Sequence, residues 1–348
     1  MTLIDQVELN EYRNDRNPLH EVVPLSTPYI IYLDPCGACN FKCNFCPCNT
    51  SDYMGTERHK MMSWDLFIKA MDDIRQFDEQ VKVIDLYANG EPLLNPRLPD
   101  MIRYIKENDI SRETRITTNG SLLCPAINAK LVDAGIDLIR ISVESLYGED
   151  YRKMCGYDID YDAFVSNIRD LYERSRERAK ISVKILTAAF HDNEDIEKFR
   201  AIFEPISDYR TVQKILDNMW SEFDDIVISS GGSTYVTNEN VIQEGWTICA
   251  MPLTMMTIHS NGLVGVCPQD WKFGTKYGDI KKESLKDAWN SQQLYYMRMM
   301  HVMGRRKELP YCKGCICVAD DNVDDVADII VDRLRNDWEA NGGEEVVF

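Results

Sequence analysis

The sequence lacks a long apolar run. Although 44% of its 348 residues are hydrophobic, no run approaches the roughly 20 residues that a membrane-spanning helix needs. Residues 1–8 also lack the basic and then apolar pattern of a secretory signal. We therefore predict a cytoplasmic protein with no membrane association.

Positive charge is scarce as well. The chain has 39 Lys and Arg residues against 57 Asp and Glu residues, a formal net charge of −18. Binding to a nucleic-acid backbone needs a basic surface, so we predict no nucleic-acid partner. The glycine-rich stretch at residues 229–233 is not followed by a Walker lysine, so it indicates a flexible turn or linker rather than a phosphate cradle.

Cysteine, by contrast, is abundant. Twelve cysteines in a cytosolic chain point to metal binding or catalysis rather than to disulfides. Five lie in residues 36–48, and only Cys39, Cys43 and Cys46 have the spacing Cys-x3-Cys-x2-Cys. Three such thiolates can hold three irons of a four-iron cluster and leave the fourth iron open to a small molecule. Zinc stays an alternative because two Cys-x2-Cys pairs occur here, although the three residues between the pairs are few for a zinc ribbon.

Short apolar runs alternate with helical patterns after a polar N-terminal arm, residues 1–28. This alternation is typical of βαβ units, and it predicts an α/β fold, a partial (β/α)6 TIM-like barrel over residues 29–235. Active residues would then follow the strand ends. The expected strands are 29–33, 81–87, 114–117, 138–143, 181–187 and 226–229, and the expected helices begin at Ser63 or cover 98–108, 125–134, 161–178 and 194–203.

A second set of cysteines lies in residues 236–320. Cys249 and Cys267 flank a hairpin-like segment at Asn261-Gly262, and Cys312 and Cys315 form a Cys-x2-Cys knuckle. Four thiolates make a closed cluster or a closed zinc site, which differs in kind from the open first site.

The first cysteine triple, with the aromatic Phe45 directly before its last member, resembles the motif of the radical S-adenosylmethionine (SAM) superfamily. The resemblance implies that the open iron chelates SAM, and that the reduced cluster cleaves SAM to a 5′-deoxyadenosyl radical. It also implies a flavodoxin or ferredoxin-type electron donor, and it makes Cys36 and Cys48 bystanders.

Polar features at the expected strand ends fit the same resemblance. On their own they are turns or solvated side chains. In the family, a Gly-Glu-Pro element holds the amino group of SAM and a Thr-Asn-Gly element lies at the SAM site, and the matching residues here are Gly90, Glu91, Pro92 and Asn119. After the fourth expected strand, Ser142 and Glu144 could hydrogen-bond ribose hydroxyls, and Arg152 could hold the SAM carboxylate by a two-pronged contact. Lys184, in the fifth expected strand, could point into the barrel or out to solvent.

The second set of cysteines resembles the auxiliary-cluster domain of radical SAM enzymes, since Gly278-Asp279-Ile280 and Leu285-x2-Ala288-Trp289 stand between its members. Only Cys317 follows, so the domain is similar to the shortened Twitch form of the SPASM domain, with one auxiliary [4Fe-4S] cluster. An acidic, amphipathic tail, residues 321–348, is expected to pack on the body as a helix or to present a partner surface.

The resemblance, which includes the aminocyclitol dehydrogenase of butirosin biosynthesis, implies an oxidoreductase for a small polar metabolite. By analogy it implies a dehydrogenase that oxidises an alcohol and uses the auxiliary cluster as electron acceptor. Asp270, three residues after Cys267, is the candidate general base, or else a solvated loop residue. The alternatives are a peptide-modifying radical SAM enzyme, a sugar epimerase or deoxygenase, and a non-enzymatic iron–sulfur electron carrier.

Overall fold

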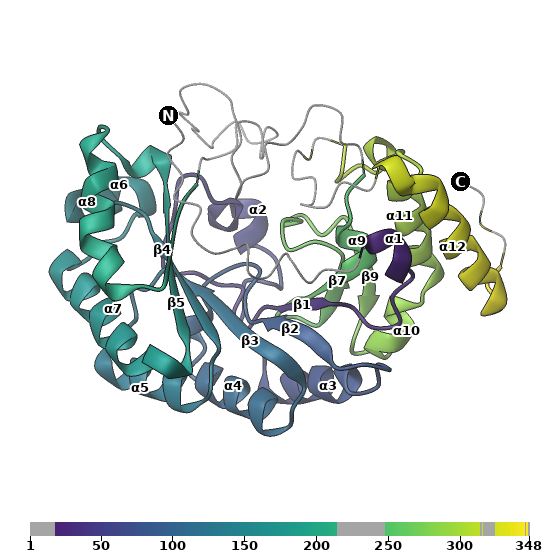
Figure 1. The fold of residues 1–348 in the computed structure, drawn as a ribbon, viewed down its shortest axis with the longest axis horizontal. Helices are drawn as coiled ribbons and strands as arrows, with labels where there is room; N and C mark the ends of the chain where they lie inside the picture. The colour runs from purple at the N-terminus through teal and green to yellow at the C-terminus, as the bar shows by residue number, and fades with distance from the viewer. Residues whose placement is uncertain (1–17, 214–247, 314, 316–323, 345, 347–348) are drawn as a thin grey trace.

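A curved sheet forms the centre of the molecule. The structure, a computed structural model, describes residues 18–213, 248–313, 315, 324–344 and 346. The first six strands in chain order all run parallel (Figure 1), which requires a crossover between each pair. They are β1 (Ile30–Leu33), β2 (Val81–Asp85), β3 (Ser111–Thr118), β4 (Leu138–Val143), β5 (Lys180–Leu186) and β6 (Tyr209–Gln213).

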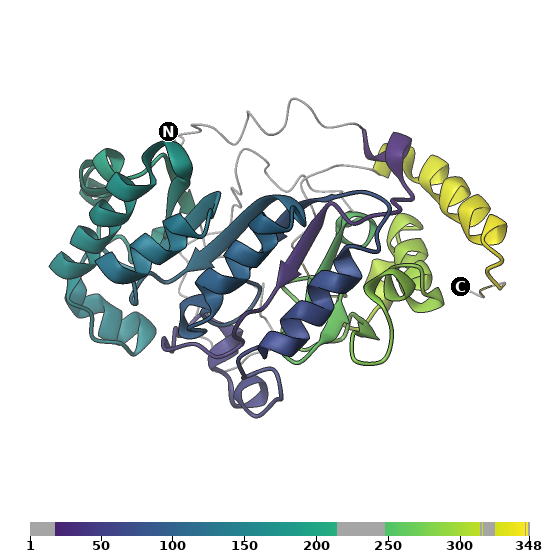
Figure 2. The same cartoon turned by 90° about the horizontal axis from the view of Figure 1, so that it is seen from below.

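Helices cover the outer face of this sheet (Figures 1 and 2). Alternate strand residues such as Ile84, Ile116 and Ile141 are fully buried and belong to one apolar core with helix residues such as Phe67. As predicted, the Ser63 side chain caps the first long helix by accepting from the backbone N–H of Leu66. The main helices are α3 (Trp64–Ile74), α4 (Leu98–Glu107), α5 (Pro125–Asp133), α7 (Tyr161–Ser175) and α8 (Glu194–Phe203).

The predicted α/β partial barrel is confirmed, and one strand needs correction. Residues 205–245 have a less regular pattern, in which we expected a strand only at 226–229, but β6 pairs with β5 at the edge of the sheet. Its sequence, Tyr-Arg-Thr-Val-Gln, lacks the apolar run that marks a central strand. The strand expected at 226–229, the linker at 229–233 and the domain boundary at 235/236 lie outside the described residues.

The segment with the second cysteine set does not form a separate sheet. Strand β7 (Met255–Ile258) pairs in parallel with β1, and β8 (Leu263–Gly265) and β9 (Lys276–Asp279) follow antiparallel. The sheet therefore has nine strands in the order β6-β5-β4-β3-β2-β1-β7-β8-β9. The hairpin predicted at Asn261-Gly262 joins β7 to β8, with Gly262 at φ +88°.

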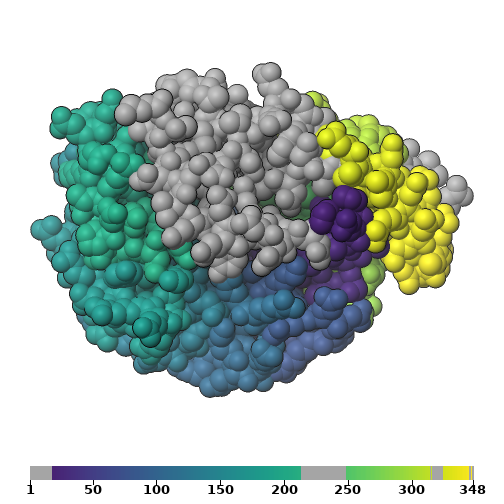
Figure 3. All heavy atoms as spheres, viewed as in Figure 1, coloured from purple at the N-terminus to yellow at the C-terminus, as the bar shows by residue number. Residues whose placement is uncertain are grey.

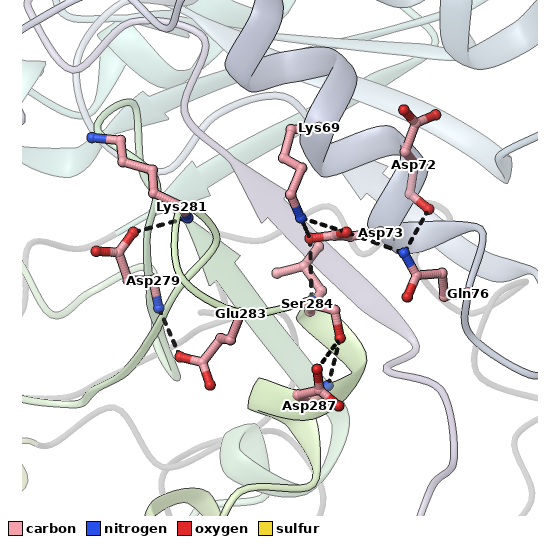
Figure 4. A network of polar contacts seen from close by, with 10 residues as sticks. Lys69, Asp72, Asp73, Gln76, Asp279, Lys281, Glu283, Ser284 and Asp287 are labelled. Carbon is pink, nitrogen blue, oxygen red and sulfur yellow. Dashed lines mark hydrogen bonds and ion pairs between the residues drawn. The ribbon is translucent and has the colours of Figure 1, made fainter.

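Polar contacts tie α3 to α10 (Leu285–Trp289) outside the sheet (Figure 4). The Asp73 carboxylate, 3% exposed, accepts from Lys69 Nζ and Gln76 Nε2 on its own side. It also accepts from the backbone N–H of Leu285 at 3.3 Å, a group that has no partner inside α10 because it lies in the first turn. The barrel and the second cysteine segment are therefore joined both by β1–β7 pairing and by this network.

The two ends of the described chain lie side by side (Figure 3). Helices α1 (Leu19–Val22) and α12 (Ala327–Ala340) share a second apolar core with α11 (Gln292–Val302). The apolar face of the tail is thus covered, because Ile330 and Leu334 are buried in that core. Within the described residues, none of the helices is both long and apolar enough to cross a membrane.

Candidate active site

The loop that follows β1 carries the first cysteine triple. Cys39, Cys43 and Cys46 are each partly buried. Burial, together with the nearby Glu91 and Cys46, raises the pKa of the Cys39 thiol to about 12. A contact with the Cys155 thiol, together with burial, raises the pKa of Cys43. The pKa of Cys46 is instead lowered, first by a contact with the Cys48 thiol, while burial opposes the shift. Cys39 and Cys43 therefore ionise readily only beside a strong positive charge, which metal ions supply.

Helix α6 (Gly148–Cys155) holds this loop from one side. The backbone N–H groups of Lys42 and Asn44 donate to the carbonyls of Cys155 and Met154 at 2.6 and 2.9 Å. Phe41, 4% exposed, packs edge-on against Tyr151 in a small apolar cluster with Cys155. Sequence reasoning missed this support, although Phe41 lies inside the motif, because nothing in the spacing links it to residues more than 100 positions away.

The Gly-Glu-Pro element after β2 lies directly on the cysteine loop. Gly90 has φ +73°, and a Cβ atom there would come within 2.3 Å of the Cys36 carbonyl oxygen, so only glycine fits. The backbone N–H of Glu91 donates to the Ala38 carbonyl at 2.8 Å, and Pro92 begins the short helix η2 (Pro92–Leu94). This turn therefore packs directly against the backbone of the cysteine loop.

The Glu91 carboxylate is buried, with 1% exposure. It accepts from Thr118 Oγ1 at 2.7 Å and from the backbone N–H groups of Asn119 at 2.8 Å and Leu93 at 2.9 Å. Burial raises its pKa to about 7, and these three donors oppose the rise. Because a carboxylate has about four acceptor positions, one remains for a ligand. Glu91 therefore links the loop after β2 to the end of β3 through these hydrogen bonds, and it is also a candidate partner for an amine.

Asn119 connects the end of β3 to the cysteine loop. Its Nδ2 donates to Asn40 Oδ1 at 2.9 Å and approaches Cys39 Sγ at 3.8 Å. Ser121 Oγ completes the group, because it accepts from Asn40 and donates to the Asn119 oxygen. Three strand ends thereby converge on the loop that contains Cys39.

The residues expected after β4 divide into two groups. Ser142 and Lys184 are paired across β4 and β5 and share the inner face, so Lys184 points into the barrel. Glu144 is buried, and burial raises its pKa while Lys184 opposes the rise. Arg152, in contrast, is exposed on α6, where it forms an ion pair with Asp158. The structure therefore does not bring Arg152 to the site. The position of Arg152 shortly after β4 was compatible with binding the SAM carboxylate. On α6, however, the Arg152 side chain faces solvent.

Polar side chains line the inner face of the sheet between the two cysteine sets. Arg140 Nη1 lies 3.4 Å from Asp85 Oδ1, and strand register places Tyr32, Asp85 and Thr257 on one face. The Thr257 hydroxyl is buried and has no hydrogen-bond partner in the described part of the chain. Burial raises the pKa of Tyr32, and the thiol of Cys267 contributes to the rise, so the polar face reaches the second cysteine set.

The four cysteines of the second set converge. Burial raises the pKa of Cys267, with contributions from Cys249 and Cys315. Burial also raises the pKa of Cys312 to about 12, again with contributions from Cys249 and Cys315. Nowhere in the described residues do three His, Cys, Asp or Glu side chains gather tightly enough for one metal ion.

Two further groups surround this second set. Asp270 Oδ2 accepts from both the backbone N–H and the Oγ1 of Thr275, at 2.6 and 2.7 Å, so it holds the loop that follows Cys267. Arg306 Nη1 donates to the carbonyls of Cys312 and Cys315, at 3.2 and 3.0 Å, and so holds the knuckle. Cys317 lies outside the described residues.

The chain matches two family models. The model described as "Radical SAM superfamily" matches residues 33–204, and the model described as "Iron-sulfur cluster-binding domain" (SPASM) matches residues 249–316. A curated relative from Pyrococcus furiosus, a tungsten-containing aldehyde ferredoxin oxidoreductase cofactor-modifying protein, is 34% identical over 117 residues, which is 33% of this chain and 31% of the relative. The chain therefore spans about a third of that relative.

Two solved structures share the fold along most of this chain. BtrN in complex with AdoMet and 2-DOIA is 17% identical, with a TM-score of 0.55 over 85% of this chain and 97% of BtrN. Streptococcus suis SuiB bound to the precursor peptide SuiA is 16% identical, with a TM-score of 0.52 over 80% of this chain and 68% of SuiB. The two family models account for both cysteine sets, because the first describes the radical SAM superfamily and the second an iron–sulfur cluster-binding domain.

Proposed function

The chain belongs to the radical SAM superfamily and carries a SPASM-type iron–sulfur domain, and from that premise we propose that it oxidises an alcohol group of a small polar metabolite such as a sugar or an aminocyclitol. When bound, the first cluster and SAM supply a radical that takes a hydrogen atom from the substrate, and the second cluster takes up one electron. The substrate also loses one proton, so that an alcohol becomes a ketone. A flavodoxin or ferredoxin-type protein would supply the electron for SAM cleavage.

Each cysteine set has its own part in this proposal. Cys39, Cys43 and Cys46, the three cysteines of this loop with the spacing Cys-x3-Cys-x2-Cys, would hold the first cluster and leave one iron open for SAM. Cys249, Cys267, Cys312 and Cys315 would hold the second cluster with no open iron. Gly90 lets the backbone approach the SAM site, and Glu91, with one free acceptor position, would receive the amino group of SAM.

The polar inner face between the two sets carries the proposal for the substrate. An apolar substrate would leave the buried Thr257 hydroxyl unsatisfied and would cover the Arg140–Asp85 pair without adding a polar contact, and both cost free energy. A polyhydroxylated molecule can both donate to Asp85 and accept from Arg140. Lys184 and Tyr32 extend the same face toward Cys46 and Cys267, respectively.

Asp270 stays the candidate for the general base. It lies close enough to the second set to raise the pKa of Cys267 and of Cys312. The N–H and hydroxyl of Thr275 both donate to Asp270 Oδ2. A substrate proton would therefore go to one of the acceptor positions of this carboxylate that Thr275 does not use.

The test separates SAM cleavage from substrate oxidation. We expect the Cys312→Ala and Cys315→Ala double variant to cleave SAM to 5′-deoxyadenosine but to form no ketone from candidate sugars or aminocyclitols. Circular dichroism must show that the variant is folded, because metal binding often stabilises small domains. A folded variant with full product formation would refute the role of the second cluster as electron acceptor.

Peptide modification is the second candidate, because SuiB, which binds a precursor peptide, shares this fold. The two candidates differ in the product that forms. Mass change in a short peptide, with no ketone from any small alcohol, would favour modification of a peptide over our proposal.

A further inference from the structure

A buried histidine contacts the second cysteine set. His301 lies in the last turn of α11, and its side chain is 4% exposed. Its Nε2 atom is 3.5 Å from Cys312 Sγ, which is hydrogen-bond distance for sulfur. The mechanism above gives this ring no part, and sequence reasoning gave it none either.

The direction of this hydrogen bond follows from the chemistry of the sulfur. A thiolate that binds iron has no hydrogen and can only accept. For the ring to bond this thiolate, Nε2 must carry a hydrogen, whether the imidazole is neutral or charged. The His301 side chain is 4% exposed, so the contact is buried at the end of the helix.

A fixed positive charge lies behind the same knuckle. Arg306 is 6% exposed, and it begins the short helix η6 (Arg306–Glu308). Arg306 donates hydrogen bonds to the carbonyls of Cys312 and Cys315. The knuckle is also bonded to the end of this helix, because the backbone N–H of Cys312 donates to the Leu309 carbonyl at 3.0 Å. The guanidinium and the knuckle therefore keep a fixed distance.

His301 and Arg306 would both stabilise negative charge on a cluster bound at the knuckle. Reduction adds one negative charge to a cluster, and hydrogen bonds to its sulfurs and nearby positive charge stabilise the reduced form more than the oxidised form. Removing either group should make the cluster harder to reduce, even when all four thiolates remain.

We propose that His301 donates its Nε2 hydrogen to the Cys312 thiolate and, together with Arg306, raises the reduction potential of the auxiliary cluster, so that this cluster can oxidise the substrate radical. The inference rests on the proposed function, since it takes Cys312 to be a cluster ligand. In that step the substrate radical loses one electron, the cluster gains it, and the substrate proton goes to a base. His301 and Arg306 are positioning residues, because they act through the knuckle and not on the substrate.

The experiment isolates the second cluster in the full-length chain. Cys39, Cys43 and Cys46 are all replaced by alanine, the protein is reconstituted anaerobically with iron and sulfide, and the potential is measured by redox titration followed with electron paramagnetic resonance. Against this background, His301→Phe removes the N–H but keeps a ring, and His301→Asn keeps an N–H donor. Arg306→Lys keeps the charge, and Arg306→Met removes it.

We expect His301→Phe to lower the reduced-to-oxidised ratio at a fixed applied potential about tenfold, which is about 59 mV for a one-electron couple. His301→Asn should recover part of the ratio, and Arg306→Met should lower it more than Arg306→Lys. A His301→Phe variant with full iron content and an unchanged potential would overturn the inference.

A second measurement does not depend on how the variants fold. In the same background, with histidine labelled with ¹⁵N, pulsed magnetic resonance of the reduced cluster should show weak coupling to one histidine nitrogen. Strong coupling would mean that His301 is itself a ligand, and no coupling would mean that the contact is absent; both would overturn the inference. Failure of the unlabelled parent to bind any iron would instead refute the proposed second cluster, so the two failures can be distinguished.

Discussion

Glu91 offers the sharpest test of the SAM site, because its carboxylate has a structural and a chemical role that can be separated. Glu91→Gln keeps the shape but replaces one acceptor oxygen with an NH₂ group. That group would face a backbone N–H, such as that of Asn119, which now donates to Oε2 at 2.8 Å. A buried donor without its acceptor costs about 1–3 kcal/mol, so we expect a loss of that size in the free energy of unfolding.

The effect on SAM should be separate and larger. If the fourth acceptor position receives the amino group, Glu91→Gln removes a charge-assisted hydrogen bond, worth about 1.5–3 kcal/mol, and the Kd for SAM should rise about 10- to 150-fold. Thr118→Val is the matched control, because it removes one donor at 2.7 Å to the same carboxylate but keeps the charge. Calorimetry on reconstituted protein should show a Kd within about threefold of the parent for Thr118→Val.

The pH dependence of stability and of SAM affinity provides a third test of Glu91. The pKa of Glu91 is raised from 4.5 to about 7, so the folded protein holds this proton in a pH range where the unfolded chain has lost it. The contribution of Glu91 to stability therefore falls as pH rises from about 4.5 to about 7, by about 3 kcal/mol at most. Affinity for SAM should rise over the upper part of that range, because the ionised carboxylate binds the amine. An equal Kd for SAM in Glu91→Gln and the parent at pH 8 would show that Glu91 does not bind the amino group of SAM. Its role would then be only to hydrogen-bond the ends of the two strands.

Four further predictions concern other parts of the site. Reconstituted protein should hold about eight irons, and replacement of Cys39, Cys43 and Cys46 together should leave about four; saturation of the parent at four irons with bound zinc would contradict two clusters. Gly90→Ala should lower both the melting temperature and the SAM affinity, since its Cβ would lie 2.3 Å from the Cys36 carbonyl oxygen; normal SAM binding would show that the loops can separate. Arg152→Ala should leave the Kd for SAM within about twofold, as expected for an exposed ion pair, and a much larger loss would return Arg152 to the site. Asp270→Asn should keep SAM cleavage but slow product formation about 10²- to 10⁴-fold, whereas unchanged turnover would assign Asp270 to the loop alone.

The sequence predicted those parts of the fold whose pattern is local. Apolar runs and the helix cap at Ser63 each follow from a few neighbouring residues, and the structure confirms them. Close spacing likewise made Cys39, Cys43 and Cys46 a recognisable set. The Gly-Glu-Pro turn was recognisable in the same way, but its contact with the backbone of the cysteine loop at Gly90 was not predicted.

What the sequence could not supply is the pairing of distant residues. Spacing alone placed Arg152 near the end of β4, but the direction of a side chain on α6 depends on how that helix docks. The parallel pairing of β1 with β7 joins segments more than 200 residues apart, and no local pattern encodes it. The contact between His301 and Cys312 is close in sequence, yet it needs the turn through η6 to bring the ring back to the knuckle.

One buried pair shows why the two cysteine sets keep a fixed relation. Asp34, at the end of β1, has 0% exposure and accepts from the backbone N–H of Asn89 at 2.6 Å, next to the Gly90-Glu91 turn. Its other oxygen lies 2.7 Å from His259 Nδ1, at the end of β7. Loss of either partner would leave a buried polar group unsatisfied. Asp34 therefore joins the Gly90-Glu91 turn to the end of the strand that leads to Cys267. If the second cluster accepts the substrate electron, as we propose, this joint would help to keep the two cysteine sets at a constant separation, on which the rate of electron transfer depends.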